Sequence, residues 1–253
     1  LLDAARDELK IWESNMLRTD IIREFGAVVV PGASAISGDI SKPYYDATEA
    51  EKDLWLANNA DRIQFGVARA NNAGNDHSVS LANVDTTNDR LSSGMARMAK
   101  RRAKEAKITP FRVKDGSEWF VMFVDSRGFR DLENDADIKA ADTNARERGV
   151  ANNPLFQGGD LLYRGIIFRE EEEFPVLKGV GNAGSDVGLG VLAGAGAVGV
   201  AWGQEPNPIT DKDEDYKFRP SVAIEELLGV KKISFDGVQR GVFTMYYSAP
   251  DDI

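Results

Sequence analysis

The sequence predicts an α+β fold, in which helices and strands occupy separate stretches of the chain and pack around a common core. Apolar residues recur every three or four positions across residues 1–25, with charged residues between them, which is typical of a long amphipathic helix. Residues 119–124 form an unbroken apolar run of strand-forming residues, which indicates an interior strand buried on both faces. Residues 231–235 and 241–247 predict a terminal hairpin or strand pair.

Composition limits the classes of protein to consider. A chain of 253 residues with 42% apolar content can bury a large core, as one elongated domain or two closely packed lobes. With 31 basic and 41 acidic side chains the net charge is −10, so we expect no global attraction to DNA or to an anionic membrane. The chain has no cysteine, which excludes disulfides and thiolate chemistry, and no apolar run long enough to span a bilayer.

The first third of the chain contains a long polar region. A short strand at residues 27–30 stops at Pro31 and Gly32, and residues 31–83 are rich in Gly, Asn, Ser and Asp, with a helical interlude at 47–60. Such long irregular segments usually serve binding or assembly. This one carries too few apolar residues to bury itself, so we expect contacts from adjacent subunits to hold it in place and the isolated subunit to be more mobile there.

Local signals place further elements in the middle of the chain. Thr86, with Asp89 three positions later, predicts the cap of a helix that runs to about Lys107. Residues 126–132 predict a short helix laid on the sheet, and residues 161–168 a second strand interrupted only by Arg164 and Gly165. Residues 179–203 are dominated by Gly and Ala, from which we expect a loop followed by a short buried helix.

Two charged segments are candidate interaction sites. One is a basic stripe on the helix that ends near residue 107, formed by Arg97, Lys100, Arg101, Arg102, Lys104 and Lys107. Only Glu105 opposes these charges locally, so the stripe is either a solvated face or a surface for DNA or an acidic neighbour. The other is an acidic run formed by Glu170, Glu171, Glu172 and Glu173. It is either an exposed acidic loop or a site that receives basic groups from another subunit.

Three weaker motifs do not indicate a catalytic, cofactor or metal site. His77 lies among Asn, Asp and Gly without apolar neighbours, which predicts a solvent-exposed loop histidine. Residues 179–184 match the Gly-x-Gly-x-x-Gly dinucleotide fingerprint, but Pro175 weakens the preceding strand and further glycines weaken the following helix. Residues 211–215 resemble the start of a calcium loop that has the wrong residues at later positions, so we interpret them as a solvated acidic turn. The sequence therefore predicts no catalytic residue, no cofactor and no metal site.

Several longer stretches carry a resemblance to a known family. They are Phe-Val-Met-Phe-Val at 120–124 with Arg-Asp-Leu at 130–132, Asn-Pro-Leu-Phe at 153–156, Tyr-Arg-Gly-Ile at 163–166, Ala-Trp-Gly at 201–203 and Gly-Val-Lys-Lys at 229–232. In these the chain resembles the major capsid proteins of tailed phages and is similar to the coliphage-N4-type coat family. The match is clear from about residue 108 to residue 245 and weaker before that.

The resemblance implies the Hong Kong 97-like coat fold, which has a spine helix, a peripheral domain and an axial domain. We accordingly expect residues 1–85 to form the peripheral domain with the spine helix, residues 86–228 the axial domain, and residues 229–253 strands that return to the peripheral domain. The N-terminal arm and projecting loop of such proteins precede the spine helix. Since Leu1 already lies in a helical pattern, we expect them to be missing here.

The implied function is mechanical. The resemblance implies a non-enzymatic coat protein that assembles as hexamers and pentamers into an icosahedral shell around the genome of a tailed bacteriophage. Its partners would be further copies of itself, scaffold, portal and decoration proteins, and packaged double-stranded DNA through non-specific contact. It would assemble in the host bacterial cytoplasm and reside in the virion capsid. Two alternatives stay open: a nucleotide-dependent enzyme built on residues 179–184, and a nanocompartment shell protein of the same fold that encloses protein cargo.

Overall fold

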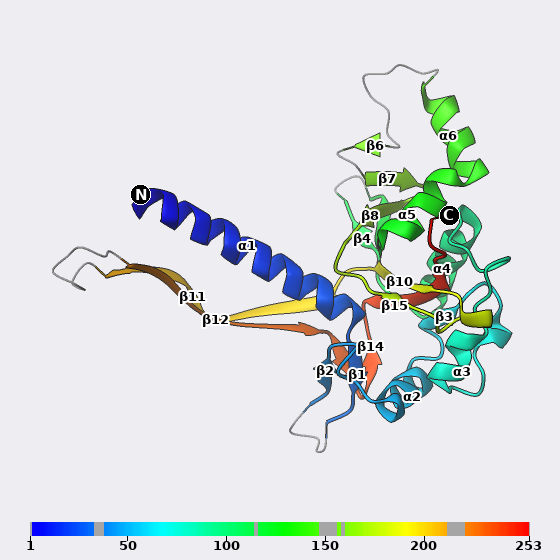
Figure 1. The fold of residues 1–253 in the computed structure, drawn as a ribbon, viewed down its shortest axis with the longest axis horizontal. Helices are drawn as coiled ribbons and strands as arrows, with labels where there is room; N and C mark the ends of the chain where they lie inside the picture. Colours follow the sequence, from blue (N-terminus) through cyan, green and yellow to red (C-terminus); the bar gives the residue numbers. More distant parts are fainter. Residues whose placement is uncertain are drawn as a thin grey trace.

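The computed structural model describes residues 2–32, 38–113, 116–146, 156–157, 160–211 and 221–252. A body built on a mixed sheet carries an extension made of one long helix and a two-stranded ribbon that lies along it (Figure 1). The described helices are α1 (Leu2–Gly26), α2 (Glu49–Asn58), α3 (His77–Ala82), α4 (Ser93–Glu105), α5 (Ser126–Asn134) and α6 (Ala136–Arg146). The described strands are β1 (Val28–Val30), β2 (Ile40–Lys42), β3 (Ile63–Phe65), β4 (Phe111–Arg112), β5 (Glu118–Val124), β6 (Phe156–Gln157), β7 (Asp160–Tyr163), β8 (Ile166–Glu170), β9 (Val176–Leu177), β10 (Val187–Ala193), β11 (Val198–Asp211), β12 (Ser221–Lys232), β13 (Ser234–Phe235), β14 (Val238–Gln239) and β15 (Val242–Ser248).

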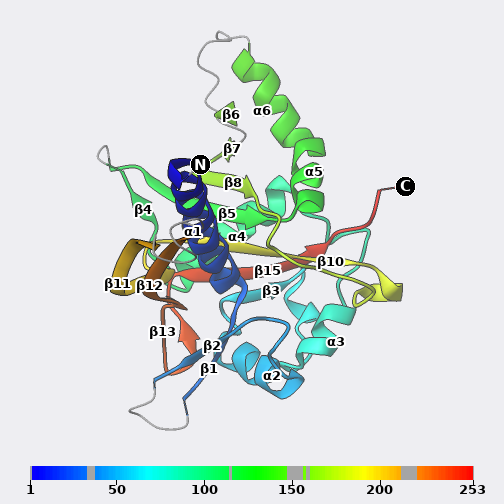
Figure 2. The same cartoon turned by 60° about the vertical axis from the view of Figure 1, so that its left-hand side comes forward.

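The central sheet has the strand order β3-β15-β10-β5-β8-β7-β6, with β4 paired to β5 and β9 paired to β10. Figure 2 shows these strands stacked from β6 at the top to β3 at the bottom, where α2 and α3 lie beside β3. The sheet is mixed, because β15 runs parallel to β3 and β5 parallel to β8, whereas β10 is antiparallel to both β15 and β5. This arrangement of helices around a mixed sheet is an α+β fold.

Both faces of the sheet are buried, because successive strand side chains point to opposite sides. On β15, Phe243, Met245 and Tyr247 enter a core shared with α4, α5 and α6. Val242 and Tyr246 enter a second core shared with α1, α2, α3 and β1. Each fully buried apolar side chain of this size contributes about 1.5–3 kcal/mol to folding, so β15 ties the two layers together.

The long N-terminal helix is confirmed as α1, but its apolar stripe is not its buried face. Trp12 is 58% exposed and Met16 is 40% exposed. The helix packs on β11 and β12 along a stripe that shares Leu9 with the apolar stripe but continues through Arg6 and Glu13 instead of Trp12 and Met16. It buries Ile22 and Phe25 where it enters the body. Periodicity therefore predicted the helix correctly, whereas the choice of the face in contact depended on the ribbon far along the chain.

The strand predicted at 119–124 is confirmed as β5, the middle strand of the sheet order. Phe120 and Met122 are completely buried, while Val121 on the other face is half-buried. The single interrupted strand predicted at 161–168 is wrong. Arg164 and Gly165 both have positive φ, 49° and 75°, and form the two-residue turn of a hairpin that joins β7 to β8.

The buried helix expected within 179–203 is also wrong, because this segment forms β10 and the start of β11. The ring of Tyr247, on the neighbouring strand, explains the glycines. A Cβ atom on Gly190 would lie 2.9 Å from the Tyr247 ring, and one on Gly188 would lie 2.8 Å from both Tyr247 Cζ and Asp125 Oδ1. Glycine is required there because the ring occupies the space that a side chain would need.

The cap predicted at Thr86 is wrong as well. Helix α4 begins at Ser93, with the side chain of Ser92 accepting a hydrogen bond from the Met95 amide at 3.3 Å. Asp89 is instead 3% exposed and accepts hydrogen bonds from the amides of Val67 (2.7 Å) and Asp85 (3.0 Å). It therefore anchors the loop after β3 to the body.

The polar region at 31–83 has its own core contacts, contrary to expectation. The helical interlude is confirmed as α2, which a capping box of Thr48 and Glu51 begins. Trp55 and Leu56 of α2 and Phe65 of β3 are at most 1% exposed. A few large side chains thus anchor a segment whose composition is polar.

The predicted terminal strand pair is wrong in its partners. Residues 234–235 and 238–239 form a minimal hairpin, β13–β14, across Asp236 and Gly237, which both have positive φ. Strand β12 pairs with β11, and β15 joins the central sheet. All of the predicted acidic turn at 211–215 beyond Asp211 lies outside the described residues.

Candidate interaction surfaces

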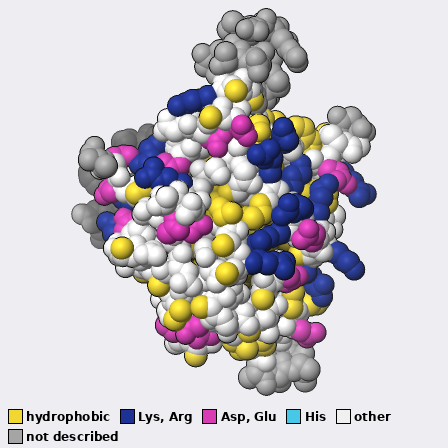
Figure 3. All heavy atoms as spheres, turned by 90° about the vertical axis from the view of Figure 1, so that its right-hand side faces the viewer, with side chains coloured by type: hydrophobic (Ala, Val, Ile, Leu, Met, Phe, Trp, Pro, Cys, Tyr) yellow, Lys and Arg dark blue, Asp and Glu magenta, His cyan; other side chains and the backbone are white. Residues whose placement is uncertain are grey.

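The basic stripe lies on the outer face of α4. Ala96, Ala99 and Ala103 are fully buried and turn the opposite face of the helix toward the sheet. Small side chains let the helix approach closely, so the long basic side chains are left on the outside. Figure 3 shows Lys and Arg side chains gathered along one side of this face of the molecule.

Besides the local Glu105, most of the stripe has partners from other elements of the chain, which the local argument did not include. The ion pairs are Arg97–Asp137 at 3.4 Å, Arg101–Glu105 at 3.8 Å and Lys104–Glu118 at 2.7 Å. Lys100 Nζ donates to the carbonyl oxygen of Arg164 at 2.6 Å. The hydrogen bond from Lys104 holds the pKa of Glu118 below its usual value.

Within the described residues, two cations of the stripe have neither an ion pair nor a hydrogen bond for the side chain. They are Arg102 and Lys107, whereas Lys100 lacks an acidic partner in the described ranges but donates to a backbone carbonyl. Arg102 is half-buried, and burial, followed by the charges of Arg69 and Arg101, lowers its pKa. It stays protonated because an arginine pKa lies far above neutral pH. The stripe therefore presents a surplus of positive charge around the last turn of α4.

The acidic run is partly an internal clamp rather than an exposed loop. Glu171 is 5% exposed and pairs with Arg18 of α1. Glu173 accepts a hydrogen bond from Thr19 Oγ1 at 3.2 Å and lies 3.3 Å from Arg23 Nε, both also on α1. Glu170 and Glu172 are exposed. Alternate members of the run thus hold α1 against the body and leave two carboxylates on the surface.

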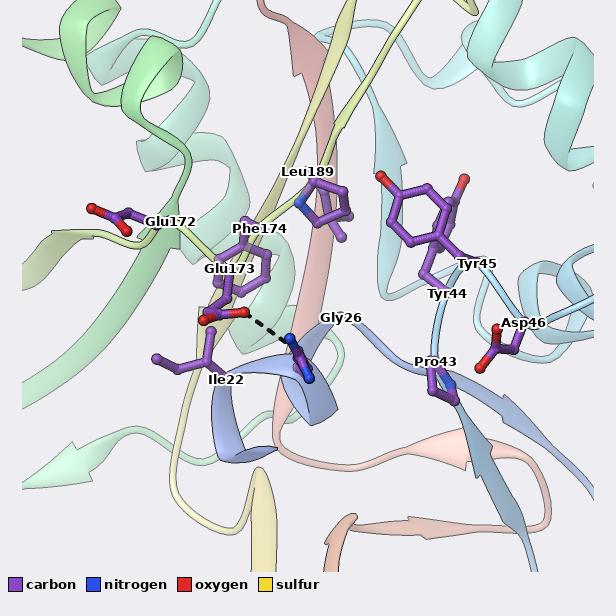
Figure 4. A pocket seen from close by; sticks show the side chains of 12 residues that line it. Ile22, Gly26, Pro43, Tyr44, Tyr45, Asp46, Glu172, Glu173, Phe174 and Leu189 are labelled. Carbon is purple, nitrogen blue, oxygen red and sulfur yellow. Dashed lines mark ion pairs between the residues drawn. The ribbon is translucent and has the colours of Figure 1, made fainter. Parts of the chain in front are cut away.

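A pocket of about 450 Å³ lies beside this clamp (Figure 4). Its apolar lining includes Ile22, Phe174 and Leu189, from three separate parts of the chain. Asp46 and Glu172 lie on opposite sides of it, and the dashed line marks the pair between Arg23 and Glu173. The rest of the lining is Gly26, Pro43, Tyr44, Tyr45 and Pro175. The pocket is therefore an apolar hollow with an acidic rim.

Exposed apolar side chains also collect on the extension. We call this set the extension surface; its members are Ile11, Trp12 and Met16 of α1, Val200 and Trp202 of β11, and Leu227 of β12, each at least 40% exposed. In the described part of the chain, β11 and β12 pair only with each other. A two-stranded ribbon is marginally stable alone, and its unpaired edges favour further contacts.

His77 is the site that sequence reasoning placed most poorly, because it is 1% exposed rather than on the surface. Its Nε2 atom lies 3.0 Å from the hydroxyl of Tyr246. Burial, above all other effects, lowers the pKa of His77 to about 4, so the ring is neutral at physiological pH. The missed signal was Asp76 as a helix cap, which places His77, Ser80 and Leu81 on one buried face of α3.

The described residues offer little for the alternative chemistries. Residues 179–184 lead into strand β10 instead of opening a helix, so the dinucleotide fingerprint lacks its helix N-terminus. No group of three or more His, Asp or Glu side chains in the described ranges is arranged to hold a metal ion. None of the helices described is both long and apolar enough to cross a bilayer.

Comparison with known proteins agrees with this architecture. Residues 45–246 match the family model described as phage capsid protein. The capsid asymmetric unit of cyanophage Pam1 is 33% identical and superposes with a TM-score of 0.85, covering 100% of this chain and 70% of that one. No match was found among curated proteins.

Two further solved structures share the fold at lower identity. The capsid of Ralstonia phage GP4 has a TM-score of 0.70 at 18% identity, covering 100% of this chain and 68% of that one. The head of Helicobacter pylori bacteriophage KHP40 has a TM-score of 0.58 at 13% identity, covering 98% and 69%. With a family match over most of its length and a full-length relative at 33% identity, the chain belongs to the phage capsid protein family and has the Hong Kong 97-like α+β fold.

Proposed function

We propose that this chain, a phage major capsid protein, assembles as hexamers and pentamers into an icosahedral shell that encloses the genome of a tailed bacteriophage. The observation that carries the proposal is the match to the phage capsid family across residues 45–246. The role is mechanical, with no catalytic step and no cofactor. The subunit would assemble in the host bacterial cytoplasm and reside in the virion capsid.

The extension surface supports repeated contact between copies. Trp12 and Leu227 are 58% and 65% exposed, an unfavourable state for large apolar groups in a lone soluble subunit. When a neighbouring subunit covers this surface, the small gain in free energy per contact is repeated in every subunit of the shell. The unpaired edges of β11 and β12 add backbone groups that a neighbour can satisfy.

The charged segments are proposed as secondary contacts. Arg102 and Lys107 supply the surplus charge with which the α4 stripe would meet packaged double-stranded DNA non-specifically or a neighbour's carboxylates, and Glu170 and Glu172 would receive basic groups from a neighbour. Because the whole chain has a net charge of −10, attraction to DNA has to be local. Scaffold, portal and decoration proteins are the further partners of this proposal.

We also keep the division into a peripheral domain (1–85), an axial domain (86–228) and returning strands (229–253) as a proposal, with one refinement. The packing of α1 on β11 and β12 supports grouping these two strands with the spine helix. The central sheet would then be the axial body. Limited proteolysis of the free subunit tests this grouping, since cleavage after α1 and on both sides of the ribbon should yield an α1 fragment and a ribbon fragment that stay associated with each other and separate from the sheet body.

Electron microscopy of the purified full chain, expressed with and without phage partners, tests the main proposal. Closed shells with hexamers and pentamers, filled with DNA when a portal is present, support it. Shells that enclose only protein cargo would favour the nanocompartment alternative. Small soluble oligomers under all conditions would contradict assembly.

The α4 stripe has its own test. Changing Arg101, Arg102 and Lys104 together to Gln should lower shell yield or salt tolerance more than it lowers the melting temperature of the free subunit. Exposed ion pairs contribute only about 0–1 kcal/mol each to folding. The matched control changes three exposed cations outside the stripe, namely Arg90, Lys178 and Arg240. Equal assembly of both variants at all salt concentrations would make the stripe an ordinary solvated face.

A further inference from the structure

The pocket beside α1 has no described occupant that matches its apolar lining and its acidic rim. Its lining is apolar, yet Asp46 and Glu172 on its rim have no cationic partner in the described part of the chain. Tyr45, which also lines it, is 70% exposed. At about 450 Å³ the pocket is in the size range of ligand pockets, roughly 300–1,000 Å³. A matching occupant is apolar with at least one positive charge.

One described segment of the chain has this chemistry and protrudes. In the β4–β5 hairpin Phe111 is 41% and Val113 is 53% exposed, and they flank Arg112, whose side chain is 70% exposed and lies 3.5 Å from Glu118, a carboxylate with which Lys104 also pairs. The Val113 amide donates a hydrogen bond to the Ser117 carbonyl (3.1 Å), and the Gly116 amide donates to the Val113 carbonyl (2.8 Å). Two large exposed apolar groups therefore flank a cation along β4 and the residue after it.

The hairpin cannot fill the pocket of its own chain. Strand β4 pairs with β5 in the central sheet, and none of the pocket residues belongs to it. Figure 2 shows β4 projecting from one edge of the molecule, away from the segment between β2 and α2 that forms one wall of the pocket. The only occupant that brings this hairpin to this pocket is a second copy of the chain.

We propose that the Phe111–Val113 hairpin of one subunit inserts into the Ile22–Tyr45–Phe174 pocket of the next, with Arg112 meeting Glu172 on the rim. This deepens the proposed function, on which it rests, by naming one contact between neighbouring subunits. The two surfaces differ, so the contact is head-to-tail and closes into a ring when repeated around an axis. Burial of Phe111 and Val113 contributes affinity, and the pairing of Arg112 with Glu172 selects the register of the contact.

The absence of cysteine from the chain allows a clean crosslinking test. The single variants Val113→Cys and Tyr45→Cys change exposed side chains, so the fold should tolerate both. They are mixed as full-length chains, assembled, oxidised and run on a non-reducing gel. A disulfide requires Cα atoms roughly 4–7 Å apart, so a crosslinked dimer should form in the mixture and not in either variant alone. The matched control mixes Val113→Cys with Val79→Cys, which is 47% exposed on α3.

A charge exchange tests the register independently. Glu172→Lys and Arg112→Glu should each slow assembly several-fold at low salt. The double variant should restore assembly, because it rebuilds the pairing of these two positions although the ion pair between Arg112 and Glu118 within the chain stays lost. Normal shells without the mixed dimer and without this rescue would overturn the contact and leave the proposed function standing. A Tyr45→Cys dimer without Val113→Cys would overturn it in favour of a two-fold contact. Absence of wild-type shells would reject the proposed function and this contact together.

Discussion

Replacing Gly188 by Ala tests whether the glycines of β10 exist to seat the ring of Tyr247. Gly188 lies opposite Tyr247 in the register of β10 with β15. The added methyl group would lie 2.8 Å from Tyr247 Cζ and from Asp125 Oδ1, and closer still to Tyr247 Cε2. Tyr247 is fully buried and hydrogen-bonded to Asp125, so the ring cannot swing into solvent.

The expected cost is that of overpacking a closed core. Forcing an extra methyl group into such a site costs about 1–3 kcal/mol. For a domain of this size each kcal/mol lowers the melting temperature by roughly 2–4 °C. We therefore expect Gly188→Ala to lower the melting temperature of the unassembled subunit by roughly 4–8 °C, which corresponds to about 2 kcal/mol.

The assay is thermal and urea unfolding of the free subunit, followed by circular dichroism. Gly229→Ala is the control, since a Cβ atom there has no neighbour within 4 Å and the residue lies in the exposed strand β12. This variant should unfold like the wild type or slightly later. If Gly188→Ala melted within a degree of the control, the ring would not be what requires glycine in β10.

Three further outcomes follow from buried polar groups. Burial lowers the pKa of His77 to about 4, so the stability that the neutral ring contributes is present above pH 6.5 and is lost as the pH falls toward 4. His77→Gln should reduce this fall of the melting temperature with pH. An unchanged dependence of the melting temperature on pH would contradict the assignment. Burial lowers the pKa of Lys232 to about 7, so above that pH the unfolded chain binds one more proton at Lys232 than the folded chain does. The free energy of unfolding of the wild type, relative to that of Lys232→Met, should therefore rise from pH 7 to 9. A difference in unfolding free energy that stays constant with pH would refute the assignment. Asp89→Ala leaves the part-buried amides of Val67 and Asp85 unpaired and should cost about 1–3 kcal/mol in urea unfolding. A cost well below about 1 kcal/mol would show that water replaces the carboxylate.

Elements set by local pattern were predictable from the sequence. The spacing of Leu9 and Trp12 sufficed for α1, and the apolar run from Trp119 sufficed for β5. Strand β10 was not predictable locally, because Gly188 and Gly190 have low strand preference and are explained by Tyr247, a residue far along the chain. Tertiary packing overrode local propensity there.

The candidate surfaces also contain one part that local pattern predicts and another that depends on tertiary packing. Helical spacing was enough to place the basic residues on one face of α4. Their partners Glu118 and Asp137 come from other elements, so the internal pairing was invisible to a local argument. The pairing of Glu171 with Arg18 likewise joins the residue after β8 to α1 across most of the chain. The pocket is lined by four separate segments and had no sequence signature.

The position of β15 has a consequence for how each subunit is made. β15 lies between β3 and β10, although it is translated long after both. At roughly 5–20 residues per second, the ribosome needs roughly 10–35 seconds to pass from Phe65 to Val242. During that time β3 has no place in the sheet and both apolar layers stay open. A truncated product that lacks β15 would lose the strand shared by both cores, so the fold itself rejects incomplete copies before they can be built into a particle.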